Sequence, residues 1–400
     1  MDVGGLRSIP SPSTSISVHP RAVPTAFRDR HSSPACMHIR CNGPNLRNLD
    51  PMKPLDLFAE IVASDDLHLI YRLLQQPENA PERNVLTAWA EGMPDRDGKF
   101  VMEFQKTFES GLWELYLHAC LKQLGHTIDF NRASPDFVVT APFPYLLEAT
   151  IASPEKGGTP AFGAGPPKLP TDFNEFNRLA ALRISNSFTA KARRYRNYYK
   201  QLSWAAAKPY VIAIAPFDRP ASQLAVNRPI IATLYGEYFD EETTIREKRD
   251  QVVHSPVKSF SKAPGVDVPV GFFTNDAYAD VSAVIYGPLA TWGKLRALAD
   301  APDRASVFTT YHPNPGSLAP IVRNTRKADY SEDLLDGLYV FHNPFAKLPL
   351  PDGVFDHPRI AQLVLDSDGT LLSLAPDDFL LMRSVHTIQT RPSTENRAKS

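Results

Sequence analysis

The sequence has few cysteines, and they form no recognisable pattern. Cys36, Cys41 and Cys120 are an odd number and include no Cys-x-x-Cys pair. This excludes both a disulfide framework and a zinc knuckle. We therefore predict a reducing, cytoplasmic setting, in which Cys120, within an apolar helical pattern, is a small buried hydrophobe.

Long apolar runs and an excess of charge are also missing. No run of about 18 apolar residues, the length that a membrane-spanning helix needs, occurs in the sequence, and its first residues lack the apolar core of a secretory signal. We therefore expect no membrane partner. The formal net charge is -1, so any attraction for a polyanion must come from local clustering. The P-loop, H-E-x-x-H and G-x-S-x-G motifs are absent as well.

What remains is the composition of a globular protein, with 43% hydrophobic and 22% charged residues. Residues 1–50 are rich in Ser, Pro and Arg without periodicity, which predicts disorder; an organelle transit peptide is the alternative. The sequence then divides into further predicted segments: a helical lead-in at 51–98, a core at 99–220, an extension of the same domain at 221–390 and a flexible tail at 391–400.

The apolar periodicity predicts an α/β fold in which a mixed sheet is flanked by helices. Helical spacing covers 104–124 and about 172–202, and strand-like patterns lie between and after these helices. The predicted strands are 126–130, 136–140, 145–151, 210–215, 230–235, 281–286, 338–342 and 361–366. We expect the last four to extend the sheet or to cover it. The role of residues 220–390 and the oligomeric state stay open.

Two acidic residues are equally far from a predicted hairpin turn. Pro142 lies at the centre of 141–144, and Asp136 and Glu148 are each six residues from it. Directly opposed residues in an antiparallel pair have Cβ atoms about 5 Å apart, so two carboxylates there repel each other unless a cation lies between them. Oxygen ligands favour Mg²⁺ or Mn²⁺.

These acidic residues belong to a pattern that resembles the PD-(D/E)xK nucleases. Glu114 lies within a helical sequence, Asp136 follows Ser134-Pro135, and Glu148 is followed by Ala149 and Thr150, over about residues 100–215. The resemblance implies a restriction-endonuclease-like sheet with C-terminal strand additions. It also implies that Asp136, Glu148 and the carbonyl of Ala149 hold the metal, while Glu114 binds a second ion or orients water.

The lysine of that motif is missing, because Thr150 stands in its place. Some members of the family supply this lysine from a following helix. Arg183, Ser187 and Lys191 are spaced at i, i+4 and i+8, so they share one face of the predicted 172–202 helix. Lys191 is therefore the candidate for stabilising the charge that develops on the phosphoryl oxygens.

A basic segment follows the acidic residues. No Asp or Glu occurs between Phe176 and Phe217, whereas eight Lys and Arg residues do, interleaved with Tyr and Trp. Such a segment is typical of a nucleic-acid surface, although a solvated helix face explains much of it. The predicted substrate-binding residues are Arg183, Ser187, Arg194 and Thr150. The first three lie in this basic segment, and Thr150 lies at the end of the acidic motif.

The predicted function is metal-dependent hydrolysis of nucleic acid, with DNA preferred over RNA. A module that has lost catalysis and only binds nucleic acid is the alternative, since Thr150 replaces the motif lysine, and a small-molecule phosphoesterase is a third hypothesis. A bland interpretation also stays open, in which Glu114, Asp136 and Glu148 are solvent-facing or turn residues. The phosphatase-like sequence 365–371 is predicted to be a hairpin turn.

Overall fold

The computed structural model describes residues 55–163, 169–366 and 368–387. The predictions for residues 1–50 and 391–400 lie outside this range. No helix of the described part is long and apolar enough to cross a membrane.

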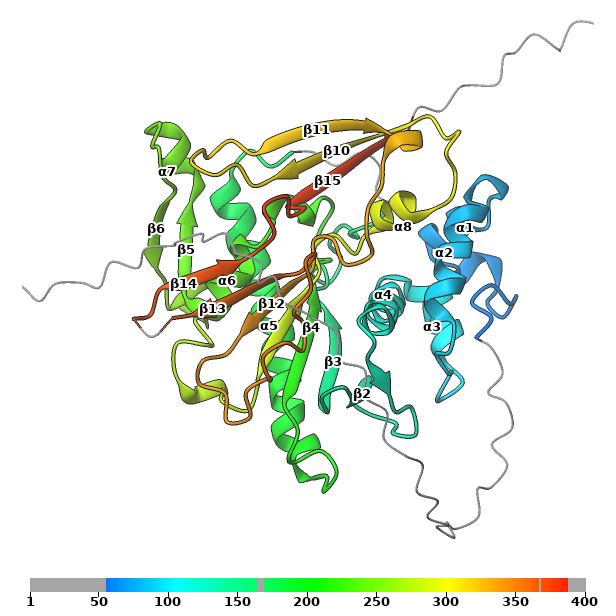
Figure 1. Cartoon of the computed structure of the whole chain (residues 1–400), viewed down its shortest axis with the longest axis horizontal. Coiled ribbons are helices and arrows are strands. Elements are labelled where there is room, and N and C mark those ends of the chain that lie inside the picture. The colour runs from blue at the N-terminus through cyan, green and yellow to red at the C-terminus, as the bar shows by residue number, and fades with distance from the viewer. Residues whose placement is uncertain (1–54, 164–168, 367, 388–400) are drawn as a thin grey trace, which may run out of the picture.

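A mixed eight-stranded sheet runs through the centre of the molecule (Figure 1). Its spatial order is β1-β2-β3-β4-β9-β12-β13-β14; β3, β4 and β9 run parallel, as do β12 and β13, and the other neighbours are antiparallel. The strands are β1 (Thr127–Ile128), β2 (Phe137–Ala141), β3 (Tyr145–Ile151), β4 (Tyr210–Ala215), β9 (Ala283–Tyr286), β12 (Tyr339–His342), β13 (Ala361–Leu365) and β14 (Leu371–Leu374). The predicted α/β class with a mixed sheet is confirmed.

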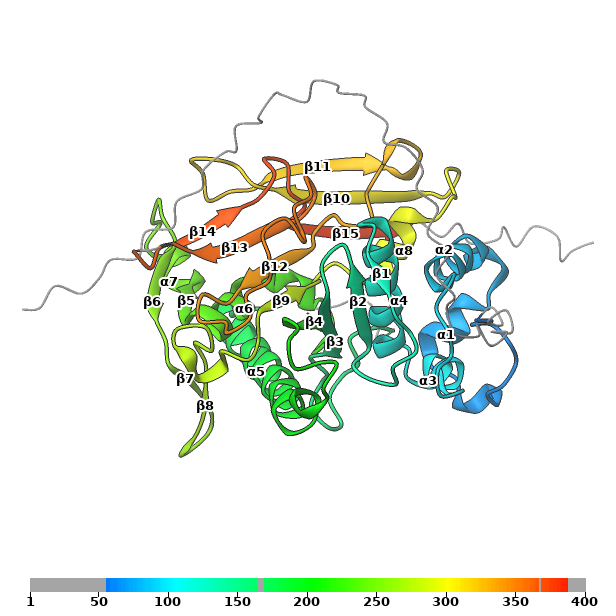
Figure 2. The same cartoon turned by 60° about the horizontal axis from the view of Figure 1, so that its bottom comes forward.

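Helices cover both faces of this sheet (Figure 2). On one face lies α4 (Glu109–Gln123), and α2 (Ala80–Ala90) and α3 (Phe100–Thr107) pack against α4, with α1 (Leu69–Leu74) next to α2. The other face carries α5 (Phe173–Asn197) and α6 (Arg228–Tyr235). Because β4 is buried along its whole length between these layers, it has the continuous apolar sequence of a central strand.

The helix predicted at 104–124 is in fact two helices. The chain turns sharply at Phe108, whose φ is 54°, between α3 and α4. Gly111 lies against the ring of Phe104, where a Cβ atom would come within 2.8 Å of a ring carbon. The apolar repeat continues across the turn because both helices bury the same kind of side chain, so periodicity alone did not reveal the break.

The prediction of a strand at 230–235 is wrong, because these residues form α6. The consecutive Ile230 and Ile231 favour a strand, but Pro229 lies in the first turn of the helix and Gly236 ends it in the left-handed conformation. All residues from Pro229 to Tyr235 are buried, so the helix shows no polar face by which the sequence would reveal its period.

Beyond α6 the chain adds strands to the central sheet and also builds smaller elements. The strands predicted at 281–286, 338–342 and 361–366 correspond to β9, β12 and β13. Leu365 pairs with Leu371 across the β13–β14 hairpin, which confirms the predicted turn. The smaller elements are β5 (Glu237–Asp240) with β6 (Val253–Pro256), β7 (Ser259–Ala263) with β8 (Val266–Pro269), and the helices α7 (Glu241–Arg246) and α8 (Trp292–Leu298).

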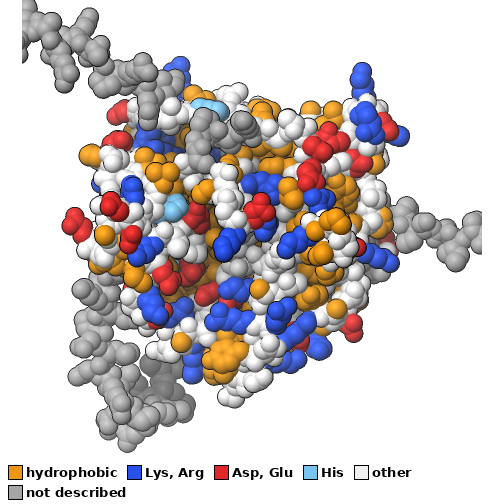
Figure 3. Space-filling view, turned by 180° about the vertical axis from the view of Figure 1, so that it is seen from behind, with side chains coloured by type: hydrophobic (Ala, Val, Ile, Leu, Met, Phe, Trp, Pro, Cys, Tyr) orange, Lys and Arg blue, Asp and Glu red, His pale blue; other side chains and the backbone are white. Residues whose placement is uncertain are grey.

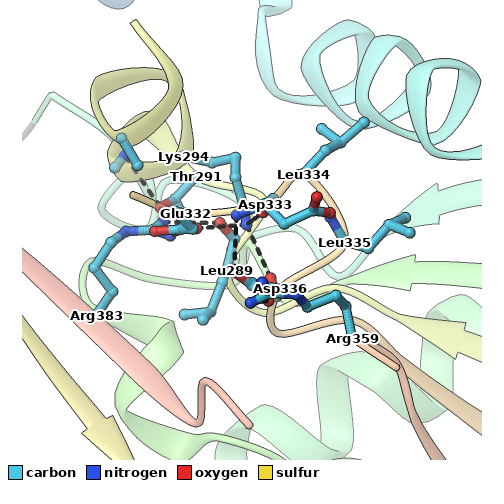
Figure 4. Close-up of polar contacts among 12 residues, drawn as sticks. Leu289, Thr291, Lys294, Glu332, Asp333, Leu334, Leu335, Asp336, Arg359 and Arg383 are labelled. Atoms are coloured by element: carbon cyan, nitrogen blue, oxygen red, sulfur yellow. Dashed lines mark hydrogen bonds and ion pairs between the residues drawn. The ribbon is translucent and has the colours of Figure 1, made fainter. Parts of the chain in front are cut away.

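A second sheet of three strands is joined to the body by a buried ion cluster (Figure 4). Its spatial order is β11 (Ile321–Arg326), β10 (Ser306–His312), β15 (Met382–Thr387). Arg383 of β15 donates to Glu332, which also binds the ammonium of Lys294 from α8 at 2.5 Å and the hydroxyl of Tyr330 at 2.5 Å. We refer to Lys294, Tyr330, Glu332 and Arg383 as the ion cluster.

Candidate active site

The β2–β3 hairpin sets the first two residues of the site. Phe137 pairs with Leu147, and Val139 pairs with Tyr145, so the turn is centred on Pro142, as predicted. Continuing this register by one residue places Asp136 opposite Glu148. Asp136 is held in this position because its Oδ2 accepts a hydrogen bond of 2.7 Å from the backbone N–H of Ala149.

Glu148 is almost fully buried, with 1% of its side chain exposed, and both of its oxygens have partners. The ammonium of Lys191 donates to Oε1 at 2.8 Å, and the hydroxyl of Tyr199 donates to Oε2 at 2.8 Å. The guanidinium of Arg194 lies 3.6 Å from Oε1. A buried carboxylate without such partners would be costly, so these groups account for its charge in an apolar layer.

The face of α5 that carries Lys191 points to β3 and the loop that follows it. The helix begins at the N-cap Asp172, whose side chain accepts from the N–H of Glu175 at 2.9 Å. Ser187 donates to the carbonyl of Ile151 at 2.9 Å, one turn before Lys191 reaches Glu148. The predicted common face of Arg183, Ser187 and Lys191 is thus seen in the structure.

Glu114 approaches from α4, on the other side of the sheet. The neighbouring Trp113 fixes this helix, because its indole N–H donates to the carbonyl of Ala213 in β4 at 3.1 Å. The Trp113 ring also lies so close to Gly287 that a Cβ atom there would be 2.5 Å from it. Glu114 is half-buried, and the charges that act on its pKa include those of Asp136 and Lys191.

The acidic residues affect each other's protonation. Burial and then the charge of Asp136 raise the pKa of Glu114 to about 8. Burial and then the charge of Glu148 raise the pKa of Asp136 to about 6, although Lys191 and the N–H of Ala149 act in the opposite direction. Burial is the larger cause in both cases, so the apolar surroundings disfavour the charged form of these two carboxylates, and a divalent cation would offset that cost.

No metal-ligand geometry is present within residues 55–163, 169–366 and 368–387, where no three His, Cys, Asp or Glu side chains are arranged to hold an ion. The chemistry of the donors is nevertheless suitable, because carboxylate and carbonyl oxygens are the ligands of Mg²⁺ and Mn²⁺. Asp136, Glu148 and the carbonyl of Ala149, with Glu114 beside them, are the residues that would hold it.

The predicted substrate-binding residues occupy different surroundings. Arg194 is half-exposed beside Glu148, whereas Arg183 forms an ion pair of 2.9 Å with Glu155 and Ser187 is bonded to the backbone. Thr150 is half-buried two residues after Glu148 and therefore on the same face of β3. The structure brings Lys191 and Arg194 to Glu148, but it engages Arg183 and Ser187 elsewhere.

Two residues at the site were missed in the sequence. Arg96 precedes α3 and donates to the carbonyls of Arg132 at 2.9 Å and Pro135 at 3.3 Å, which holds the chain entering Asp136. Its charge lowers the pKa of both Glu114 and Asp136. Arg96 belongs to no motif. The second missed residue, Tyr199, lies in the basic, aromatic segment directly after α5, and this position was the sequence signal that could have placed it near Glu148.

Comparison of the chain with protein-family models, with curated proteins and with solved structures finds no match.

Proposed function

We propose that this chain is a nuclease of the PD-(D/E)xK type that hydrolyses phosphodiester bonds with a bound Mg²⁺ or Mn²⁺. The contact of 2.8 Å between Lys191 and Glu148 is the observation that carries the proposal. Lys191, which follows Glu148 by 43 residues and lies on α5, supplies the cation that the motif lacks at Thr150. Asp136 lies opposite Glu148 in the hairpin register and completes the pattern.

Each residue has a role that its surroundings support. A divalent cation held by Asp136, Glu148 and the carbonyl of Ala149 would polarise the phosphate and lower the pKa of the attacking water. Glu148 takes one of the three N–H donors of Lys191, whose side chain is 22% exposed, so the remaining donors are available to a phosphoryl oxygen. Glu114, with its pKa raised to about 8, is suited to exchange a proton with water near neutral pH.

The direct test is cleavage of plasmid and single-stranded substrates at low salt with Mg²⁺ or Mn²⁺. We expect cleavage by the wild-type protein and by the control Asp368→Asn, which changes an exposed acid in the β13–β14 turn. Asp136→Asn should abolish it. Equal cleavage by the wild-type protein and Asp136→Asn would show that the activity arises elsewhere.

A lysine exchange tests the role of Lys191 more sharply. Lys191→Met should lose cleavage, and the double substitution Lys191→Met with Thr150→Lys should recover part of it, because position 150 faces the same side of β3 as Glu148. Recovery would show that the site needs a cation and not the particular helix. If the double variant is folded and binds Mg²⁺ but does not cleave, a lysine at position 150 cannot replace Lys191, and this interpretation is wrong.

One observation favours the alternative of a binding module without catalysis. Both oxygens of Glu148 already have protein partners, Lys191 and Tyr199. A metal would have to compete with these two groups for the carboxylate. If the wild-type protein binds nucleic acid but does not cleave it with any divalent cation, this alternative replaces the nuclease.

A further inference from the structure

The C-terminal end of α5 and the short 3₁₀ helix that follows it, Tyr199–Gln201, form a surface with excess positive charge. Lys and Arg side chains gather over the lower part of the face shown in Figure 3, where this end of α5 lies. Arg196 and Lys200 share one carboxylate, Asp280, and Arg193 makes no ion pair with a described residue. The surface therefore retains charge that protein carboxylates do not neutralise.

An exposed aromatic ring lies within this surface. Tyr198 connects α5 to the 3₁₀ helix, and 50% of it is exposed, whereas the adjacent Tyr199 is fully buried. The centres of the two rings are 5.5 Å apart and their planes are tilted by 52°, so the exposed ring contacts the buried one. A large apolar ring that is kept in solvent and held in place is a suitable platform for another flat group.

The same surface adjoins the carboxylates of the candidate site. The backbone N–H of Tyr198 donates to the carbonyl of Arg194 at 3.0 Å, and Arg194 reaches Glu148. Arg194 also lies over the ring of Tyr199, at 5.4 Å from its centre, while the hydroxyl of Tyr199 binds Glu148. A nucleic-acid backbone whose phosphates bind the exposed cations would therefore pass beside the acidic residues.

We infer that the substrate is an unpaired nucleic-acid strand, with one base stacked on Tyr198 and its phosphates held by Arg193, Arg194 and Lys200. This inference depends on the proposed function and specifies its substrate class. An aromatic ring recognises the face of a base, and that face is free in a single strand but covered by neighbouring base pairs in a duplex. The ring carries no information on the sugar, so the strand is DNA or RNA.

The test is fluorescence anisotropy with labelled single strands of about 20 nucleotides and with the matching duplex, in EDTA so that nothing is cleaved. Oligothymidylate and oligouridylate separate DNA from RNA. We expect each strand, or one of them, to bind about 10-fold more tightly than the duplex, and Tyr198→Ala to remove about that factor for the strand alone. Tyr198→Phe should bind like the wild-type protein, because it keeps the ring.

Matched controls separate stacking from charge. Arg193→Ala should weaken strand and duplex alike and reduce the salt dependence, whereas Arg323→Ala, which removes an exposed arginine of β11, should change neither. Tighter binding of the duplex, or unchanged strand binding by folded Tyr198→Ala, would overturn the inference without affecting the nuclease proposal. Strand binding that depends on Tyr198 without any cleavage would instead refute the nuclease proposal and keep the strand as the ligand.

Discussion

Two buried glutamates in this molecule have the same kinds of partner but lie in different surroundings. Glu332 binds Lys294, Arg383 and Tyr330, and Glu148 binds Lys191, Arg194 and Tyr199. Each glutamate has 1% of its side chain exposed. The two cations of Glu332 are also buried, at 0% and 1%, whereas those of Glu148 are 22% and 52% exposed.

The pKa values of the acids separate the two regions further. Burial would raise the pKa of Glu332, but Arg383 and Lys294 together hold it below its usual value. At the candidate site the pKa values of Asp136 and Glu114 are raised, to about 6 and about 8. The charge of Glu332 is thus held by two buried cations, whereas the raised pKa values of Asp136 and Glu114 occur beside cations that solvent can reach. The same side chains can therefore serve stability in one place and chemistry in the other.

The largest effect is expected when the ion cluster is broken. Glu332→Gln leaves the ammonium of Lys294 and the guanidinium of Arg383 buried without a carboxylate. We expect the free energy of unfolding to fall by about 3–5 kcal/mol, measured by urea denaturation. Glu148→Gln should cost clearly less, because the partners of Glu148 can turn to water; an equal loss for both variants would remove the distinction.

The second effect concerns activity. Lys191→Met should lower the rate of cleavage about 100- to 1,000-fold, the usual effect of removing one donor to a developing negative charge. Its midpoint of urea denaturation should change little, since Arg194 and Tyr199 remain beside Glu148. Single-turnover cleavage and denaturation of the same preparation check both statements. Loss of stability in parallel with loss of cleavage would make Lys191 a purely structural residue.

The third effect is a difference in pH dependence. Folding raises the pKa of Glu114 to about 8, so the stabilisation from its protonated form is complete below its usual pKa and is lost as the pH rises through 8. Glu114→Gln, which stays neutral, should therefore raise Tm at pH 9 by about 5 °C in EDTA and change it less at pH 6. An identical change at both pH values would contradict the raised pKa.

The smallest effect is expected for the hydroxyl of Tyr199. Tyr199→Phe removes the hydrogen bond to Oε2 of Glu148 and keeps the ring in the core. We expect the Mg²⁺ concentration at half-maximal cleavage to fall about 10-fold, because the metal no longer competes with this hydrogen bond for the carboxylate. Tyr330→Phe, the matching change in the ion cluster, is the control and should leave this concentration unchanged.

The sequence was informative where the pattern is local. Residue spacing around Pro142 predicted the register that opposes Asp136 to Glu148, and helical spacing predicted the face that brings Lys191 to β3. The buried helix α6 was mistaken for a strand because it has no polar face. Arg96 was not found, because only the folded chain brings its guanidinium to the carbonyls of Arg132 and Pro135.

The ion cluster was also not predicted, since its members are far apart in the chain and each is an ordinary charged residue in its own segment. They become partners only because three parts of the chain pack against one another: α8, β15 and the segment that precedes β12. No motif or period relates Lys294 to Glu332 or Arg383. Such contacts depend on tertiary packing, which the local sequence does not encode.

Because Arg383 lies late in the sequence, the ion cluster can be completed only late in synthesis on the ribosome. Glu332 and Lys294 are made first, and Arg383 follows Glu332 by 51 residues. Until β15 has emerged, Glu332 lacks one of its two cations and β10 lacks one of its two neighbouring strands. The last described strand thus completes a charge balance and a sheet in the same step, so a nascent chain stalled before it would expose an unfinished interior to other proteins.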